Sequence, residues 1–120
     1  MYTALVIDEA DRKMIIDSFD SVPEGFEVIL HHMTICMGKC DDASLIGKRF
    51  PIKIVTFASN ELVAAYGIET ECPSKNERKH ITIAVNREKG GKPVMSNKLE
   101  LWMPTFIKFP IIYGTVEECQ

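Results

Sequence analysis

The sequence predicts an α+β fold built mainly of antiparallel sheets with few helices, in two lobes whose motif strands face a central cleft. Three observations predict it. Most apolar segments are short runs rich in β-branched residues, and one segment carries helix signals. The segments HHMTICMGK (31–39) and KHITIAVN (79–86) also share a histidine–apolar–threonine–isoleucine core. Such an internal echo fits a fold in which each of two lobes contributes one strand to a shared cleft.

The first elements follow from local signals. Residues 2–7, YTALVI, predict a strand, and Asp8 predicts the N-cap of a helix with Glu9 and Asp11 in its first turn. The helix is expected to run to about Phe19. A helical spacing relates Ala10, Met14, Ile15 and Phe19, so these side chains are expected on its apolar face.

The remaining elements are mostly strands. A long strand is expected from about Phe26 to Met37, followed by a polar connection over 38–47 with DDAS in its middle. Residues 49–58 and 61–69 predict a hairpin, and 72–78 a polar loop. Further predictions are a strand over 79–86, a flexible turn over 87–93, and final strands over 98–107 and 110–118.

Composition limits the class of protein. The 120 residues are expected to form a single domain (1–120), because 46% are hydrophobic and 26% are charged, as in ordinary globular proteins. No apolar stretch approaches the roughly 20 residues of a membrane helix, and the N-terminus lacks the features of a signal peptide. We therefore expect a cytoplasmic location, in a cell or an infected host, and no membrane partner.

The four cysteines, at positions 36, 40, 72 and 119, are expected to be free thiols in such a compartment. The alternative is a zinc site, because His31, His32, Cys36 and Cys40 lie within ten residues. Their spacing is unlike that of a metal knuckle, and a strand would send the two histidines to opposite faces. The sequence therefore predicts no metal and no cofactor.

Charge is unevenly distributed along the chain. The net charge is −3, which argues against indiscriminate binding to nucleic-acid backbone. Residues 75–98 contain seven basic and two acidic groups, so this segment carries +5 and the remainder −8. The segment is either a solvated loop or a positive rim for a small anionic substrate. The presence of His80 within it favours the rim.

Strand alternation places an imidazole and a hydroxyl together in both copies of the echo. His32 and Thr34 share one face of their strand, and His80 and Thr82 share one face of theirs. His31 is expected on the opposite face, as a structural residue. One histidine on a strand is more often structural than functional, but two in the same context indicate a site. Neutral and protonated imidazole can act as base and acid, and hydroxyls can hold phosphate oxygens.

His32-Met33-Thr34-Ile35 and His80-Ile81-Thr82-Ile83 resemble the paired signature of the two-histidine (2H) phosphoesterase superfamily. The similarity extends over roughly residues 28–102 and includes PVMSNKL (93–99). It is to the compact branch associated with RNA repair (Swiss Army Knife) and with phage. The chain departs from larger members in having fewer than 50 residues between motifs, and a helix usually packed on the second lobe is expected to be missing or reduced.

The resemblance implies a metal-independent phosphodiesterase that acts on a 2′,3′-cyclic phosphate or a 2′–5′ linkage of RNA or a nucleotide. His32 and His80 would be the catalytic pair, and Thr34 and Thr82 the phosphate ligands. Lys92 and Ser96 are candidate substrate contacts because they lie near the second motif. The alternatives are a phage-type enzyme that degrades cyclic oligonucleotide signals, a non-catalytic module that binds a nucleotide or RNA end, and the zinc domain. The aromatic side chains Tyr66, Trp102, Phe106 and Tyr113 could stack a base, but strand aromatics are more often core.

Overall fold

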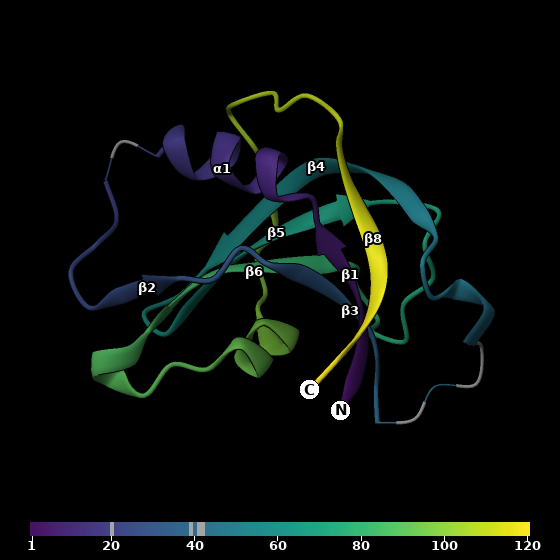
Figure 1. The fold of residues 1–120 in the computed structure, drawn as a ribbon. Helices are drawn as coiled ribbons and strands as arrows, with labels where there is room; N and C mark the ends of the chain where they lie inside the picture. Colours follow the sequence, from purple (N-terminus) through teal and green to yellow (C-terminus); the bar gives the residue numbers. More distant parts are fainter. Residues whose placement is uncertain (20, 39, 41–42) are drawn as a thin grey trace.

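The computed structural model describes residues 1–19, 21–38, 40 and 43–120. The described residues form eight strands, one α-helix and short 3₁₀ turns. The two termini lie side by side (Figure 1). The elements are β1 (Tyr2–Ile7), α1 (Glu9–Asp17), β2 (Phe26–Val28), β3 (His32–Met37), η1 (Ala43–Leu45), β4 (Arg49–Ser59), β5 (Val63–Glu69), β6 (His80–Asn86), η2 (Arg87–Lys89), η3 (Pro93–Lys98), β7 (Met103–Pro104) and β8 (Ile112–Cys119).

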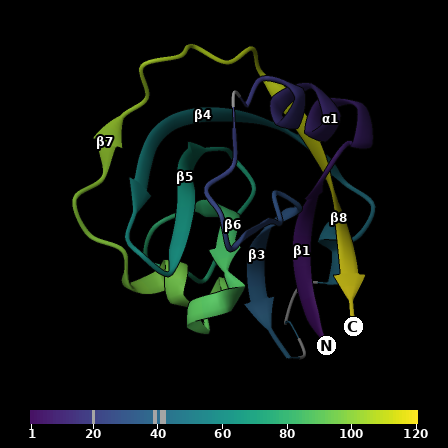
Figure 2. The same cartoon turned by 90° about the vertical axis from the view of Figure 1, so that its left-hand side faces the viewer.

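The strands pair in the order β2-β6-β5-β4-β8-β1-β3, and β7 adds to β4. Every pairing is antiparallel, so the predicted α+β class with mainly antiparallel sheet is confirmed. The long strand β4 pairs with β8 through its first residues and with β5 through its later ones. Figure 2 shows the consequence: the sheet curls until β3 and β6 lie side by side.

The predicted single strand over 26–37 is wrong, because it divides into β2 and β3. β2 pairs with β6, whereas β3 pairs with β1 at the other end of the sheet. Leu30, between them, is fully buried and has a φ of 37°, a left-handed conformation that a leucine rarely adopts. The chain thus changes partner strand at this point, which no hydrophobic pattern in the sequence records.

Both faces of the sheet are covered. Ile15 of α1 packs against one face, in a core that includes Leu5, Ile52 and Ile81. On the other face, Val63, Ala65 and Val85 pack with Leu99 and with the partly buried Met95 and Trp102 of the segment that follows β6. In Figure 1, α1 lies above the sheet and η3 below it.

The helix is shorter than predicted, and its apolar face differs. Asp8 occupies the N-cap position, but its side chain makes no capping bond and instead pairs with Arg49 at 2.6 Å. The helix ends at Asp17. Ala10 and Met14 are exposed, contrary to expectation, and Ile15 is the buried residue.

The expected strand over 98–107 is also wrong, since only Met103 and Pro104 pair with β4. Leu101 has a φ of 52°, and the ring nitrogen of Trp102 donates to the carbonyl oxygen of Leu99 at 3.1 Å. This local fold seats Trp102 against the sheet. The predicted strands over 2–7, 49–58, 61–69, 79–86 and 110–118 are found within two residues at each end.

The cysteine prediction is half wrong. Cys36 and Cys40 form a disulfide at the end of β3, whereas Cys72 and Cys119 are free thiols. Part of the predicted polar connection, residues 39, 41 and 42, lies outside the described residues, and η1 forms one turn of helix in the rest. In the described part of the chain, no helix is long and apolar enough to cross a membrane.

Candidate functional site

One pocket of about 340 Å³ brings together the four motif side chains, His32, Thr34, His80 and Thr82. They come from β3 and β6, strands 48 positions apart in sequence. Six further residues line this pocket, hereafter the motif pocket: Tyr2, Met37, Asn76, Pro93, Val94 and Asn97.

The strand register explains the meeting of the two histidines. β2 pairs with β6 so that Val28 lies opposite Ala84, and the backbone N–H of Leu30 donates to the carbonyl oxygen of Thr82 at 3.0 Å. Continued along the chain, this register places His32 across from His80. There β3 has left β6 to pair with β1, and the two strands lie close without forming a ladder. The space between them is the motif pocket.

Alternation then orients the side chains as the sequence predicted. Met33 and Ile35 on β3, and Ile81 and Ile83 on β6, are buried in the main core. His32, Thr34 and Thr82 are half-buried on the opposite face, while His80 is 7% exposed. The apolar face of each strand therefore holds the polar face in place.

The predicted orientation of His31 is wrong. It was expected on the face of Met33, but it is exposed and does not enter the core. The regular strand begins at His32, and the left-handed residue Leu30 precedes it, so the alternation does not extend back to His31. Its Nδ1 instead lies 2.9 Å from the Nδ1 of His32.

His80 is held in one tautomer by its backbone surroundings. Its Nδ1 lies 2.8 Å from the carbonyl oxygen of Arg78. A carbonyl oxygen can only accept a hydrogen bond, so Nδ1 carries a hydrogen, and Nε2 is the ring nitrogen that can exchange a proton with a substrate. The ring of Trp102 lies beside it, with centroids 6.3 Å apart.

His32 lies in a more restrictive environment. The Tyr2 ring is 5.1 Å away and the His31 ring 5.2 Å away, centroid to centroid. Burial, followed by the charges of His31 and His80, lowers the pKa of His32 to about 4. Because the charge of His80 is one of the causes, a proton on His80 disfavours protonation of His32. His32 is therefore uncharged near neutral pH.

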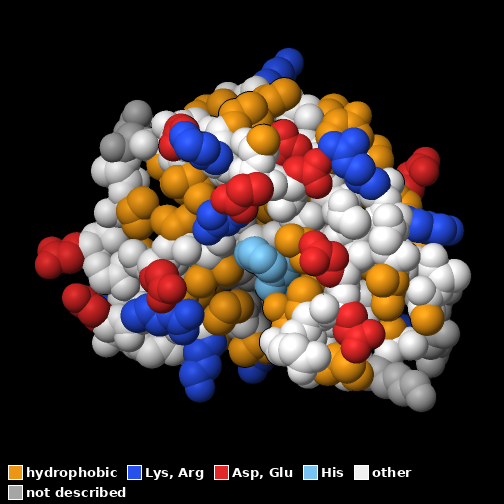
Figure 3. Space-filling view, in the orientation of Figure 1, with side chains coloured by type: hydrophobic (Ala, Val, Ile, Leu, Met, Phe, Trp, Pro, Cys, Tyr) orange, Lys and Arg blue, Asp and Glu red, His pale blue; other side chains and the backbone are white. Residues whose placement is uncertain are grey.

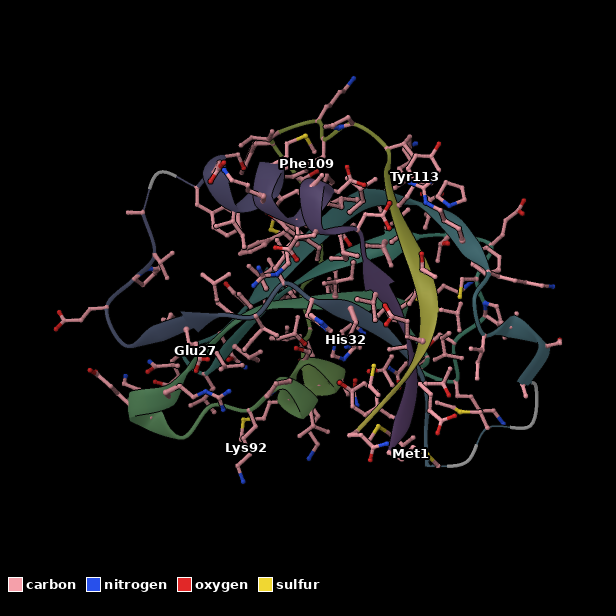
Figure 4. The ribbon with its side chains drawn as sticks, in the orientation of Figure 1. Met1, Glu27, His32, Lys92, Phe109 and Tyr113 are labelled. Carbon is pink, nitrogen blue, oxygen red and sulfur yellow. A yellow bond between two sulfur atoms is a disulfide. The ribbon has the colours of Figure 1, made fainter. Side chains whose placement is uncertain are left out.

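The threonines differ in their support. The Thr82 hydroxyl lies 2.8 Å from that of Ser96, whose side chain is 1% exposed on η3. Ser96, predicted to touch substrate, thus anchors Thr82. Thr34 is positioned through its backbone, because its carbonyl oxygen accepts from the Ser74 hydroxyl at 2.8 Å. Lys92, the other predicted contact, is exposed and absent from the motif pocket, and Figure 4 shows it pointing away from His32.

Sequence reasoning missed several lining residues. Tyr2 reaches the pocket because β1 pairs with β3, placing Val6 opposite His32 and Tyr2 opposite Met37. Burial and the neighbouring Cys119 raise the pKa of Tyr2, which stays protonated at neutral pH. Asn76 comes from the loop before β6, and Asn97 from η3. The position of Asn76 could have been suspected only from the polar loop before the second motif.

Figure 3 shows the histidine side chains reaching the surface in the middle of one face, bordered by hydrophobic groups and by charges of both signs. The predicted positive rim is thus not a continuous basic patch on this face. Among the described residues, no three His, Cys, Asp or Glu side chains converge as a metal site would require. The disulfide also occupies two of the four ligands that the zinc alternative needs.

Comparison with protein-family models finds none that matches this chain, and comparisons with curated proteins and with solved structures find no match either.

Proposed function

We propose that this protein is a phosphodiesterase of the two-histidine type, which cleaves a 2′,3′-cyclic phosphate or a 2′–5′ phosphodiester of RNA or a nucleotide. The observation that carries the proposal is the convergence of two imidazoles and two threonine hydroxyls, from two separate strands, on the motif pocket. The segments that bear them belong to the two halves of the sheet joined by β4, which supports a two-lobed arrangement about a central cleft.

The surroundings of the histidines suggest separate roles. His32 is uncharged near neutral pH because its pKa lies at about 4, so we assign it as the base that takes a proton from the attacking water. A bound phosphodiester is anionic and raises the pKa of His32 toward the range in which proton transfer is efficient. His80 keeps its Nδ1 hydrogen on the Arg78 carbonyl, so its protonated Nε2 can donate to the leaving oxygen as the water oxygen bonds to phosphorus.

The two threonine hydroxyls can stabilise the charge that develops on the phosphate. Negative charge accumulates on the non-bridging oxygens of the phosphate in the transition state, and preorganised donors stabilise it. Thr34 and Thr82 both line the motif pocket, and the contact with the Ser96 hydroxyl holds the Thr82 hydroxyl oxygen in position. These groups need no metal for the reaction, so we expect turnover to persist in the presence of a chelator.

The test is hydrolysis of nucleoside 2′,3′-cyclic monophosphates, 2′–5′ linked dinucleotides and cyclic di- and trinucleotides, each with and without EDTA. His32→Ala and His80→Ala are each expected to lower kcat by at least about a hundredfold, the usual range for loss of a general acid or base. Thr34→Val and Thr82→Val are expected to lower kcat/KM, while Thr115→Val, on β8 and outside the lining of the motif pocket, serves as the matched control. Full activity in either histidine variant would refute the assignment. Preferential turnover of the cyclic oligonucleotides would assign the signal-degrading role instead.

A further inference from the structure

A second pocket adjoins the motif pocket and shares three residues with it. Its volume is about 900 Å³, and Asn76, His80 and Asn97 line both pockets. Arg78 and Trp102 line only the second pocket, hereafter the tryptophan pocket. A molecule that places one group against His80 can therefore extend directly into it.

The tryptophan pocket contains a preformed stack. The guanidinium carbon of Arg78 lies 5.1 Å from the centroid of the Trp102 ring, and that ring lies 6.3 Å from the ring of His80. Trp102 is fixed by its bond to the Leu99 carbonyl, and its ring packs against the backbone at Gly67, where a β-carbon would come within 3.3 Å of it. Planar aromatic and guanidinium groups are the surfaces on which unpaired bases stack.

The volumes of the two pockets suit different parts of a substrate. Small-molecule sites commonly range from about 300 to 1,000 Å³, so the motif pocket lies near the lower limit and the tryptophan pocket near the upper. The motif pocket suits a single nucleotide. The tryptophan pocket has room for a further nucleoside, and the side chains of Asn76 and Asn97 can form hydrogen bonds with a base edge or a sugar.

We propose that the tryptophan pocket binds the nucleotide next to the scissile phosphate, stacked on Arg78 and Trp102. This inference rests on the proposed function, and it names the substrate class: an oligonucleotide of at least two residues. A free nucleoside 2′,3′-cyclic monophosphate fills only the motif pocket and is a poor substrate.

The kinetic test compares uridine 2′,3′-cyclic phosphate with an adenylyl-uridine dinucleotide that ends in the same cyclic phosphate. We expect kcat/KM of the wild-type protein to be at least about tenfold higher for the dinucleotide, the gain typical of one stacked base. Arg78→Ala and Trp102→Leu should each lower kcat/KM for the dinucleotide more than for the mononucleotide, and so remove most of this preference. Arg87→Ala, which removes an arginine paired with Glu27 elsewhere, should retain the preference.

A binding test is independent of catalysis because Trp102 is the chain's single tryptophan. A 2′-deoxy dinucleotide with a 3′-phosphate, which cannot form a cyclic phosphate, should quench its fluorescence, since the base stacks on the Arg78 guanidinium that covers the indole. Inorganic phosphate and the corresponding mononucleotide should quench it little. Arg78→Ala should weaken dinucleotide binding, and it leaves the fluorophore and the backbone carbonyl that holds His80 in place.

The outcomes separate the two proposals. Equal kcat/KM for both substrates, without dinucleotide quenching, would overturn the tryptophan pocket as a subsite and leave the phosphodiesterase intact. Quenching that depends on Arg78, without turnover of any substrate, would support the subsite and overturn the phosphodiesterase. Absence of both would overturn both.

Discussion

The buried histidine His32 should make the stability of the protein depend on pH in a defined direction. Its pKa is about 4 in the folded protein and 6.5, the ordinary value, in the unfolded chain. Between these values the unfolded chain binds more protons than the folded protein, so lowering the pH through this window favours unfolding. Above this pH window His32 is unprotonated in both states, so its titration no longer destabilises the folded protein.

The size of the effect follows from the two pKa values. At pH 4.5, His32 is protonated in nearly all unfolded molecules but in a minority of folded ones, and the difference amounts to about 2.5 kcal/mol of the free energy of unfolding relative to pH 7.5. His32→Gln removes the titrating ring. The wild-type protein should therefore lose about 2.5 kcal/mol more than this variant between the two pH values.

Urea denaturation at pH 7.5 and 4.5 measures the difference, and subtraction of the variant cancels the carboxylates that titrate in the same range. His31→Gln is the matched control, because it also loses one histidine but keeps the titration of His32. The pKa difference of His32 between the folded and unfolded states should be smaller in this variant, since the charge of His31 helps to lower the pKa of His32. Equal pH slopes in wild-type protein and His32→Gln would refute the reasoning, as would an NMR titration that gave His32 a pKa near 6.5. In the active protein, the same pKa should place the acid limb of kcat/KM well below pH 6.5.

Three substitutions test the supports of the site. Gly67→Ala should cost about 1–3 kcal/mol in denaturation, because the new β-carbon collides with the Thr56 hydroxyl, and it should shift the emission of Trp102; unchanged stability would contradict the packing. Thr56→Val should raise the free energy of unfolding by up to about 1 kcal/mol, because this buried hydroxyl has no hydrogen-bond partner in the described part of the chain. A lower free energy of unfolding would contradict this reasoning. Ser96→Ala should cost about 1 kcal/mol and lower kcat/KM by freeing the Thr82 hydroxyl, and unchanged kinetics would exclude that anchoring role.

Local patterns in the sequence were sufficient to find most strands. The alternation of β4, β5 and β6 and the turn between β4 and β5 are encoded within short windows, and these elements lie where they were predicted. The break at Leu30 could not be found in this way, because residues 26–37 are continuously suited to a strand. What divides them is competition between two partner strands, β6 and β1, which only the folded sheet decides.

The candidate site, too, could be predicted from local patterns only in part. The periodicity of two in a strand was enough to pair His32 with Thr34 and His80 with Thr82. It failed at His31, one residue before regular strand geometry begins. The contribution of Trp102 was hidden for another reason: its segment resembles a strand in composition but folds irregularly onto the sheet beside Gly67.

The change of partner at Leu30 is what opens a site in an otherwise continuous sheet. Had the segment continued along β6 in the register of β2, ladder hydrogen bonds would have closed the space between His32 and His80. Instead β3 turns to β1, at the cost of a left-handed leucine that full burial helps to offset. The two strands remain close enough for the charge of His80 to lower the pKa of His32, yet far enough apart to leave a pocket of about 340 Å³ between them. A strained residue two positions before His32 thus sets the width of the space into which a phosphate must fit.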